Sequence, residues 1–178
     1  MSGGFDAETC LATIEREKVT WITCVPTHLF RILALPNEVR SRYDISSLKA
    51  VLHSAAPCPR DVKQAIMKSL PPGVLWEIYG GTEGSMTMIS PTEALERPGS
   101  VGKAKPPGTT LKIMDEAGNE LANGEPGLVY GTPLTHFRYR GAQELDSQTW
   151  RGELYTLGDV GYLDEDGYLF LTDRLKDM

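Results

Sequence analysis

The sequence contains few cysteines, and their spacing argues against two kinds of cross-link. The 178 residues include three cysteines, Cys10, Cys24 and Cys58, and no C-x-x-C pair occurs. An odd number of widely spaced cysteines indicates neither a disulfide framework nor a thiolate metal site. Because thiols stay reduced in the cytoplasm, we expect a cytoplasmic protein with free cysteines.

Long apolar runs and basic clusters are absent as well. No stretch approaches the roughly 20 apolar residues of a membrane-spanning helix, and the first residues lack the basic-then-apolar pattern of a signal peptide. Lysine and arginine total 18 against 24 aspartates and glutamates, a formal net charge of −6. Without a basic block we expect no nucleic-acid partner. Hydrophobic residues make up 40%, which is typical of a folded globular chain.

Several signatures of enzyme chemistry are also missing. The chain has no G-x-x-x-x-G-K-[ST] phosphate loop and no G-x-G-x-x-G fingerprint. It has no H-E-x-x-H or G-x-S-x-G motif either. Its histidines, His28, His53 and His136, are too scattered to indicate a metal site.

The first half of the chain alternates helix patterns with strand patterns. Asp6 is suited to be the N-cap of the first helix, and Pro59 suits the first turn of the third. Strands separated by helices predict a partly parallel sheet flanked by helices. Ligands of such sheets bind at the carboxyl ends of the strands. The predicted helices cover residues 7–18, 27–35 and 59–69, and the predicted strands cover residues 20–25, 48–53 and 74–79.

From about residue 98 onward, short strand patterns are separated by turns. Residues 110–114 and 127–131 have strand patterns, and residues 164–167 predict the turn of a hairpin. The fold class we predict is therefore α/β. It has a partly parallel sheet subdomain over residues 1–97 and a small antiparallel β-lobe, a distorted barrel, over residues 98–178.

A glycine-rich segment, residues 79–84, directly follows the third predicted strand. Glycine lets a ligand approach the backbone closely, and Tyr79 offers a flat face on which a nucleobase can stack. Thr82 can donate to a phosphate oxygen, and Glu83 can bind Mg²⁺, which prefers carboxylate and phosphate oxygens. A glycine turn that only closes the strand explains the same residues and is common.

A run of small residues follows the second predicted strand and could form a slot against a planar base. A tight strand-to-helix turn explains the run as well. His53, just before it, is more often a structural histidine with satisfied hydrogen bonds than a ligand. Cys58, just after it, has no evident acid–base partner that would make it a nucleophile. The small residues are Ser54, Ala55, Ala56 and Pro57.

Charged residues toward the end of the chain form a third candidate. Asp159 follows a glycine, and a carboxylate there can accept hydrogen bonds from both hydroxyls of a ribose. Arg174 supplies a planar fork for ribose or phosphate oxygens. A turn at residues 158–159 and a solvated charge cluster at residues 173–177 explain the same residues without a ligand.

Taken in order, these segments resemble the adenylate-forming superfamily, which includes acyl-CoA synthetases, luciferases and peptide-synthetase adenylation domains. The resemblance spans essentially the whole chain and is closest to fatty-acid and related carboxylate–CoA ligases. The segments that carry it are Val25-Pro-Thr27, Asp44-Ile-Ser-Ser-Leu48, Ser54-Ala-Ala-Pro57, Tyr79-Gly-Gly-Thr-Glu83, Pro98-Gly-Ser-Val-Gly102, Gly158-Asp159 and Asp164-Glu-Asp-Gly-Tyr168.

The resemblance implies a two-step reaction. ATP and a carboxylic acid, here a fatty acid, give an acyl-adenylate and pyrophosphate. The thiol of CoA then attacks the acyl carbon, which gives a thioester and AMP. ATP, Mg²⁺ and CoA as a substrate are the small molecules that such a protein would bind.

The resemblance also implies roles for individual residues. Thr82 would contact the α-phosphate and Glu83 would bind Mg²⁺, so these two residues would carry the catalysis. Lys176 would be the hinge between the large and small domains of the family. The nucleotide-binding set would comprise Ser54, Ala55, Ala56 and Pro57 at the adenine slot, Tyr79 and Gly80 beside the base, Thr82 at the phosphate, and Asp159 with Arg174 at the ribose.

Two parts of the family pattern are absent from the sequence. The Ser/Thr/Gly-rich phosphate loop would precede residue 1, and the small domain with the adenylation lysine would follow Met178. Asp173 stands where many members have glycine. We therefore expect an internal fragment of the large domain that is inactive, or nearly so, by itself.

Two other interpretations stay open. The parent could be an adenylation or acyl-AMP ligase module that loads a carrier protein, because the acceptor site of the family lies largely in the missing domain. Alternatively, the chain could be a natural short protein that binds a nucleotide or a partner without catalysis.

Overall fold

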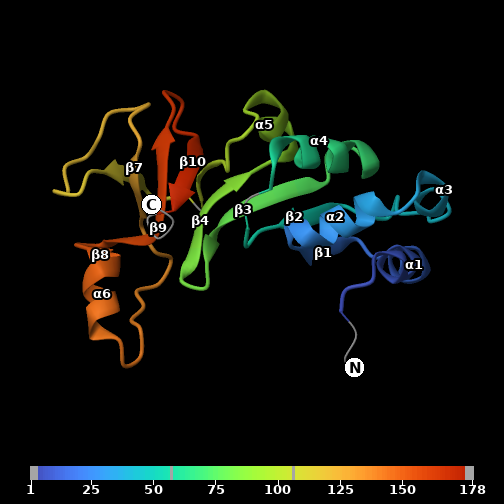
Figure 1. The fold of residues 1–178 in the computed structure, drawn as a ribbon, viewed down its shortest axis with the longest axis horizontal. Coiled ribbons are helices and arrows are strands. Elements are labelled where there is room, and N and C mark those ends of the chain that lie inside the picture. Colours follow the sequence, from blue (N-terminus) through green and yellow to red (C-terminus); the bar gives the residue numbers. More distant parts are fainter. Residues whose placement is uncertain (1–3, 57, 106, 175–178) are drawn as a thin grey trace. The chain divides into compact units, whose positions relative to one another are not determined.

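The computed structural model describes residues 4–56, 58–105 and 107–174, which form six helices and ten strands (Figure 1). The chain divides into two compact units. Unit 1 holds the residues up to Glu77 together with Ser90–Thr92, and unit 2 holds Ile78–Ile89 together with the residues from Glu93 onward. Each unit is described by itself below.

Unit 1 is built on parallel strands joined by helices. Strand β1 pairs with β2 in parallel, and β2 pairs with β3 in parallel, so each connection needs a crossover helix. This confirms the predicted partly parallel sheet with flanking helices. The elements are α1 (Ala7–Glu17), β1 (Trp21–Cys24), α2 (Pro26–Ala34), α3 (Asn37–Arg40), β2 (Ala50–His53), α4 (Arg60–Ser69) and the first part of β3 (Leu75–Gly81).

The ends of the first two helices follow from local chemistry. The Asp6 side chain accepts a hydrogen bond from the Thr9 backbone N–H at 2.7 Å, which confirms the predicted N-cap of α1. Lys18, with φ of 48°, ends this helix in the left-handed conformation. Pro26 begins α2, where its missing N–H is not needed, and Pro36 follows the end of that helix.

The core of unit 1 lies where α4 covers the parallel strands. Val51 on β2 and Ile66 on α4 are both fully buried. Because α4 and the strands share this apolar layer, the strand ends of unit 1 are held at fixed spacing. The other buried members of the cluster are Ile14, Cys24, Leu29, Leu48, Val74 and Leu75.

Unit 2 is dominated by antiparallel strands. Its larger sheet has the strand order β10-β9-β7-β6, with β8 paired to β9, which confirms the predicted antiparallel lobe. In the other sheet, β4 neighbours β3 and pairs with the short β5. The elements are β4 (Gly84–Ile89), β5 (Lys103–Ala104), β6 (Leu111–Met114), β7 (Gly127–Gly131), α6 (Gln143–Thr149), β8 (Trp150–Arg151), β9 (Leu154–Leu163) and β10 (Leu169–Arg174), and α5 (Pro91–Glu96) begins in unit 1.

The predicted hairpin at residues 164–167 is present between β9 and β10. The Asp164 side chain accepts hydrogen bonds from the backbone N–H of Asp166 at 3.0 Å and of Tyr168 at 2.8 Å. Gly167 has φ of 78°, a conformation that glycine adopts without steric cost. Strand β4 and the helices α3, α5 and α6 were not predicted from the sequence.

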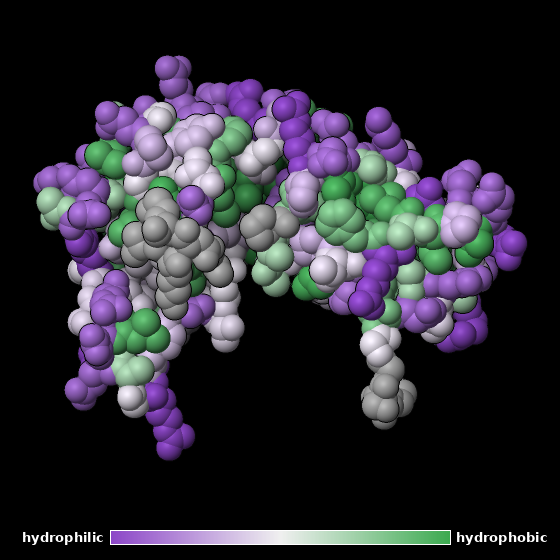
Figure 2. Space-filling view, in the orientation of Figure 1, coloured by the Kyte–Doolittle hydropathy of each residue, from purple (hydrophilic) through white to green (hydrophobic). Residues whose placement is uncertain are grey.

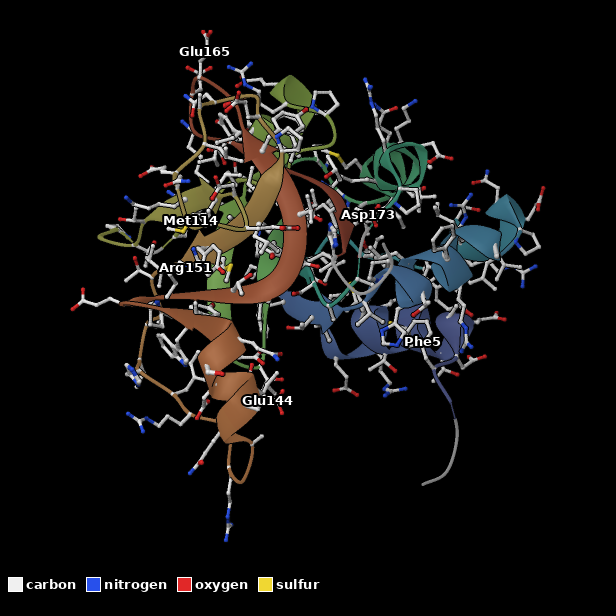
Figure 3. The ribbon with its side chains drawn as sticks, turned by 60° about the vertical axis from the view of Figure 1, so that its left-hand side comes forward. Phe5, Met114, Glu144, Arg151, Glu165 and Asp173 are labelled. Carbon is white, nitrogen blue, oxygen red and sulfur yellow. The ribbon has the colours of Figure 1, made fainter. Side chains whose placement is uncertain are left out.

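Unit 2 has its own buried centre, formed by Met86, Ile113, Val129, Tyr155 and Leu169. At its edge, Arg151 (Figure 3) lies against the turn that follows β6 and donates to the Glu116 carbonyl at 3.4 Å. On the visible face of the molecule, hydrophilic residues are prominent and hydrophobic residues show as several patches (Figure 2). In the described part of the chain, no helix combines the length and the apolar character needed to cross a membrane.

The buried layer under α4 makes a quantitative prediction about stability. Replacing Ile66 by alanine should lower the free energy of unfolding by about 2–5 kcal/mol, because it leaves a cavity beside Val51. Urea denaturation followed by circular dichroism measures this change. On the same helix, Gln64 is exposed, and Gln64→Ala should change the stability by less than about 0.5 kcal/mol. Equal losses in the two variants would contradict the assignment of this core.

Candidate functional site

Thr82 and Glu83 form the two-residue turn that joins β3 to β4. Space requires a glycine at Gly80, where the neighbouring atoms are backbone, whereas at Gly81 the neighbour is the end of a movable side chain. A Cβ at Gly80 would overlap the Gly84 carbonyl oxygen, and a Cβ at Gly81 would overlap the Glu83 carboxylate. The backbone of the two strands therefore approaches more closely than other residues would allow. Thr82 is exposed at the tip of this turn.

Two tyrosines from other elements of unit 2 surround Glu83. The Tyr139 hydroxyl donates to Glu83 Oε1 at 2.6 Å, and the Tyr155 hydroxyl donates to the Gly84 carbonyl at 3.3 Å. Burial, together with the nearby Glu83 carboxylate, raises the pKa of Tyr139 to about 12. The same two causes raise the pKa of Tyr155 to about 12. Both hydroxyls therefore stay protonated and serve as donors beside the carboxylate.

An irregularity in the pairing of β9 sets the direction of the Asp159 side chain. The pairing of β9 with β7 shifts between Leu128 and Tyr130 of β7, opposite residues 156–160. Gly158, with φ of 80°, occupies this shift, as is common where a bulge redirects a side chain. The buried Asp159 side chain then accepts a hydrogen bond from the Tyr79 hydroxyl at 2.8 Å. Arg174 lies opposite Asp159 in the register of β10 with β9.

A cavity of about 530 Å³ lies within unit 2 beside the glycine turn. The turn residues contribute backbone groups, a hydroxyl and a carboxylate to its wall. Tyr79 and Asp159 do not line it, although their neighbours do. The lining residues are Gly80, Gly81, Thr82, Glu83, Leu128, Tyr130, Tyr139, Leu145, Gln148, Thr149, Thr156, Leu157 and Gly158.

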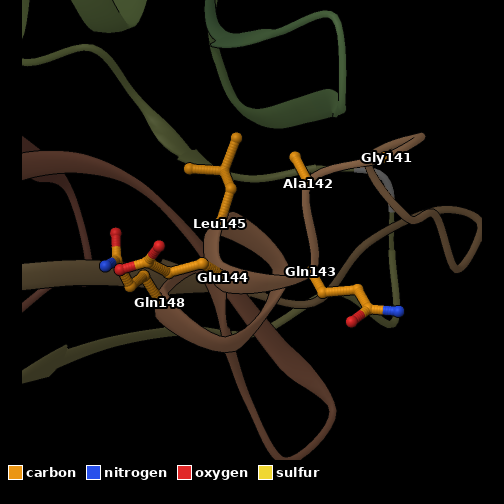
Figure 4. Close-up of a pocket in the computed structure, with 6 residues that line it drawn as sticks. All are labelled: Gly141, Ala142, Gln143, Glu144, Leu145 and Gln148. Atoms are coloured by element: carbon orange, nitrogen blue, oxygen red, sulfur yellow. The ribbon is translucent and has the colours of Figure 1, made fainter.

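A second recess, of about 540 Å³, lies at the start of α6 (Figure 4). Glu144 is the one charged residue among those that line it, beside residues 141–143, Leu145 and Gln148. A lone carboxylate with no facing cation does not suit an anionic ligand, so this recess is not the candidate site.

The predicted adenine loop belongs to unit 1 and follows β2. The Ser54 N–H donates to the Cys24 carbonyl at 3.3 Å, which extends the parallel pairing by one residue. Ala55 and Ala56 are exposed, and Ala55 has φ of 75°, in the left-handed region that alanine rarely adopts. Pro57 and Lys176 lie outside the described residues.

Beneath this loop, unit 1 contains a buried group of charged and polar side chains. Glu77 on β3 is 6% exposed and pairs with Lys63 on α4, which is 8% exposed. His53 is fully buried, and its Nε2 lies 3.7 Å from Glu77 Oε2, too far for a hydrogen bond. Within the described part of the chain, neither ring nitrogen of His53 has a hydrogen-bond partner. The expectation of a structural histidine with satisfied hydrogen bonds is therefore wrong.

Burial governs the charges of this group. It lowers the pKa of His53 to about 4, with a further contribution from the Lys63 charge, so this imidazole is neutral near pH 7. Burial also raises the pKa of Glu77, against the opposing effect of Lys63. The nearby thiol of Cys58 has its pKa raised to about 11, mainly by burial and then by Glu77. A thiol with this pKa is not an activated nucleophile.

Comparison with known proteins shows where this arrangement belongs. A family model described as "AMP-binding enzyme" matches residues 2–132, which is more than half of the chain. The chain belongs to the AMP-binding enzyme family. It is 31% identical to a probable CoA ligase of Humulus lupulus, over 98% of this chain and 32% of that protein.

Two solved structures show the same fold. The amide bond synthetase from Marinactinospora thermotolerans has a TM-score of 0.88 and 31% identity, over 96% of this chain and 35% of that one. The O-succinylbenzoate coenzyme A synthetase from Bacillus subtilis, in complex with ATP and magnesium ion, has a TM-score of 0.83 and 25% identity. That match covers 98% of this chain and 35% of the synthetase. The chain spans about a third of the length of the curated relatives it matches.

Sequence reasoning missed three residues of this AMP-binding chain that touch the candidate sites. Tyr139 lies 56 positions from Glu83 in a segment without a helix or strand pattern, so nothing in the sequence pointed to the contact. Lys63 and Glu77 are residue types that usually lie on the surface. The strand pattern at residues 74–79 could have indicated a buried Glu77, because its neighbours in the sequence are apolar.

The contact between Tyr139 and Glu83 predicts an unusual titration. In Glu83→Gln the negative charge beside the hydroxyl is gone, so the pKa of Tyr139 should fall from about 12 toward the ordinary tyrosine value. NMR of ¹³Cζ-labelled tyrosine, assigned with Tyr139→Phe, follows this group alone. At about pH 11 the signal should still be that of a protonated phenol in the unaltered chain and a titrating one in the variant. Glu144→Gln, on the exposed face of α6, is the matched control, and an equal midpoint in both variants would refute the contact.

Proposed function

We propose that this chain is the central part of an ATP-dependent acid–thiol ligase, which activates a carboxylic acid as an acyl-adenylate and transfers the acyl group to CoA. The observation that carries the proposal is the glycine turn of unit 2. Its backbone, hydroxyl and carboxylate groups converge on one cavity in a chain of the AMP-binding family. The chain by itself would bind the nucleotide and have little or no ligase activity.

In unit 2 the proposed contacts follow the chemistry of the side chains. The Thr82 hydroxyl would donate to an oxygen of the α-phosphate, and the open backbone at Gly80 would let the nucleotide approach. Asp159, fixed by the Tyr79 hydroxyl, would accept hydrogen bonds from the ribose hydroxyls with help from Arg174. The ring of Tyr79 would stack on the base.

In unit 1 the proposed contact is the loop after β2. Ser54, Ala55, Ala56 and Pro57 would line the slot for the adenine ring. The exposed small side chains of Ala55 and Ala56 leave the loop backbone accessible to a flat ring. A left-handed residue also turns successive backbone groups in directions that a regular strand cannot offer.

The donor set of the glycine turn fits Mg²⁺ held jointly with a nucleotide. Mg²⁺ is usually bound by one or two carboxylates together with substrate phosphates, and Glu83 is the carboxylate of the turn. Among the described residues, no group of three or more His, Cys, Asp or Glu could hold a metal alone. When bound, Mg²⁺ would offset the negative charge that builds on the phosphate oxygens. The protein residues would then orient the phosphate and exclude alternative geometries.

The proposal also specifies the carboxylic acid that is activated and the acceptor of its acyl group. A fatty acid and CoA are our choices, because the segments Ala55-Ala-Pro-Cys-Pro59 and 168–174 resemble fatty-acid–CoA ligases. The similarity to an amide bond synthetase favours a second candidate, an activating enzyme with another acceptor. A carrier protein and a non-catalytic nucleotide-binding role remain the further alternatives. The cytoplasmic location stays a prediction from the cysteine count.

Nucleotide binding is the direct test of the proposal. Titration calorimetry of this chain with ATP and Mg²⁺ should detect one site, and Asp159→Asn should weaken it by about 1.5–3 kcal/mol, or one to two orders of magnitude. Tyr79→Phe, which frees Asp159 from its hydroxyl partner, should cause a smaller loss. Glu153→Gln, exposed just before β9, should leave the affinity unchanged. An unaltered affinity in Asp159→Asn would remove Asp159 from the ribose role, and no binding at all would remove the proposed function.

Product analysis decides the acceptor. A protein of the relatives' length that contains this segment is given ATP, Mg²⁺ and a fatty acid, with CoA, an amine or a carrier protein in turn. We expect AMP release to depend on CoA and the mass of an acyl-CoA to appear. Acyl transfer to the amine or the carrier protein, with none to CoA, would establish the corresponding alternative.

A further inference from the structure

Two residues that flank the connection from β2 to α4, His53 and Lys63, lie near the same buried carboxylate. His53 is the last residue of β2 and lies opposite Glu77 in the parallel register of β2 with β3. Lys63 lies in the first turn of α4, where its N–H donates to the Pro59 carbonyl at 2.9 Å. The Lys63 ammonium pairs with Glu77 Oε2, the same oxygen that lies 3.7 Å from His53 Nε2. One side chain of β3 therefore lies near both flanks of the loop between them.

The buried pair is a poor source of stability. Taking two charges out of water costs free energy that their attraction only partly returns, so apolar replacements of such pairs are often as stable. The best-attested use of a buried ion pair is instead to fix one arrangement among several. Lys63 fits this use, because it lies on the same face of α4 as the fully buried Ile66 and points into the unit.

The loop itself holds a conformation that needs such a constraint. Ala55, with φ of 75°, is one of two described non-glycine residues with positive φ. Alanine stays in the left-handed region only when its surroundings over-determine it. The Ala55 side chain is exposed, so we look for the constraint in the residues that flank it on β2 and α4.

We propose that Glu77 is a positioning residue for Ala55: by pairing with Lys63 on α4 and lying opposite His53 on β2, it constrains residues on both sides of Ala55 and holds that residue in its left-handed conformation. This inference rests on the proposed function in one respect, namely that the loop contacts the adenine ring of a nucleotide. Glu77 does not touch the nucleotide and acts through Ala55.

The first test compares nucleotide affinity in two backgrounds. Glu77→Gln should weaken ATP binding by about 5- to 30-fold, the effect expected when one strained residue is released. In the Ala55→Gly background the same substitution should cost less than about 2-fold, because glycine reaches positive φ without steric penalty. Glu120→Gln, which breaks the exposed pair with Lys112, is the control and should not change the affinity.

A second variant covers the case in which Glu77→Gln fails to fold, since that substitution removes the carboxylate that pairs with the buried Lys63 charge. Lys63→Met/Glu77→Leu removes both charges and should keep the fold, yet it should lose affinity to the same extent. Urea denaturation confirms that each variant is folded under the conditions of the titration. A loss of equal size in the Ala55 and Ala55→Gly backgrounds would overturn the proposal and leave Glu77 a purely structural role.

A spectroscopic readout separates this inference from the proposed function. NMR coupling constants and ¹³C shifts of Ala55 report its φ in the absence of any nucleotide. We expect the left-handed signature in the unaltered chain and its loss in both Glu77 variants. If the unaltered chain binds no ATP but Ala55 changes as expected, the proposed function fails and the positioning role stands. If Ala55 keeps its signature in the variants, the positioning role fails whatever the affinity.

Discussion

The pairing of β9 is the interaction on which unit 2 depends. Buried backbone N–H and C=O groups must be paired, and this ten-residue strand provides partners for β7, β8 and β10. The irregular stretch in its pairing with β7, at Gly158, is also where it directs Asp159 toward the Tyr79 hydroxyl. The strand that completes the sheet therefore also places a candidate ribose contact, and the two roles cannot be altered independently.

Two glutamates of this chain are compensated in different ways, which separates a structural charge from one that can bind a ligand. Glu77 is buried against a cation of its own unit, so its negative charge is neutralised inside the fold. Glu83 receives a hydrogen bond from the Tyr139 hydroxyl, which orients the carboxylate but carries no charge. Glu83 also lines the cavity of unit 2, which is why we propose Glu83, and not Glu77, as the carboxylate that binds Mg²⁺.

The sequence predicted what local chemistry and periodicity decide. Asp6 could be recognised as a cap, and the alternation of helix and strand patterns predicted the parallel pairing of β1, β2 and β3. Strand β4 begins at a glycine directly after a glycine-rich turn and alternates over only four residues, and helix α6 has the sequence QELDSQT with one apolar residue, so both patterns are too weak for such predictions. Contacts made across long separations, such as Tyr139 with Glu83, depend on the pairing of whole sheets, and no local pattern encodes them.

The two-residue turn between β3 and β4 has a consequence for how this protein can vary. Successive residues of a strand face opposite sides, so a shift of one residue exchanges every side chain between the two faces. A single inserted residue at the Thr82-Glu83 turn would move Met86 out of the centre it shares with Val129 and Tyr155. It would also carry Glu83 away from the Tyr139 hydroxyl. We therefore expect an insertion or deletion in this turn to disrupt the fold. Substitutions of the residues around the turn should be tolerated better.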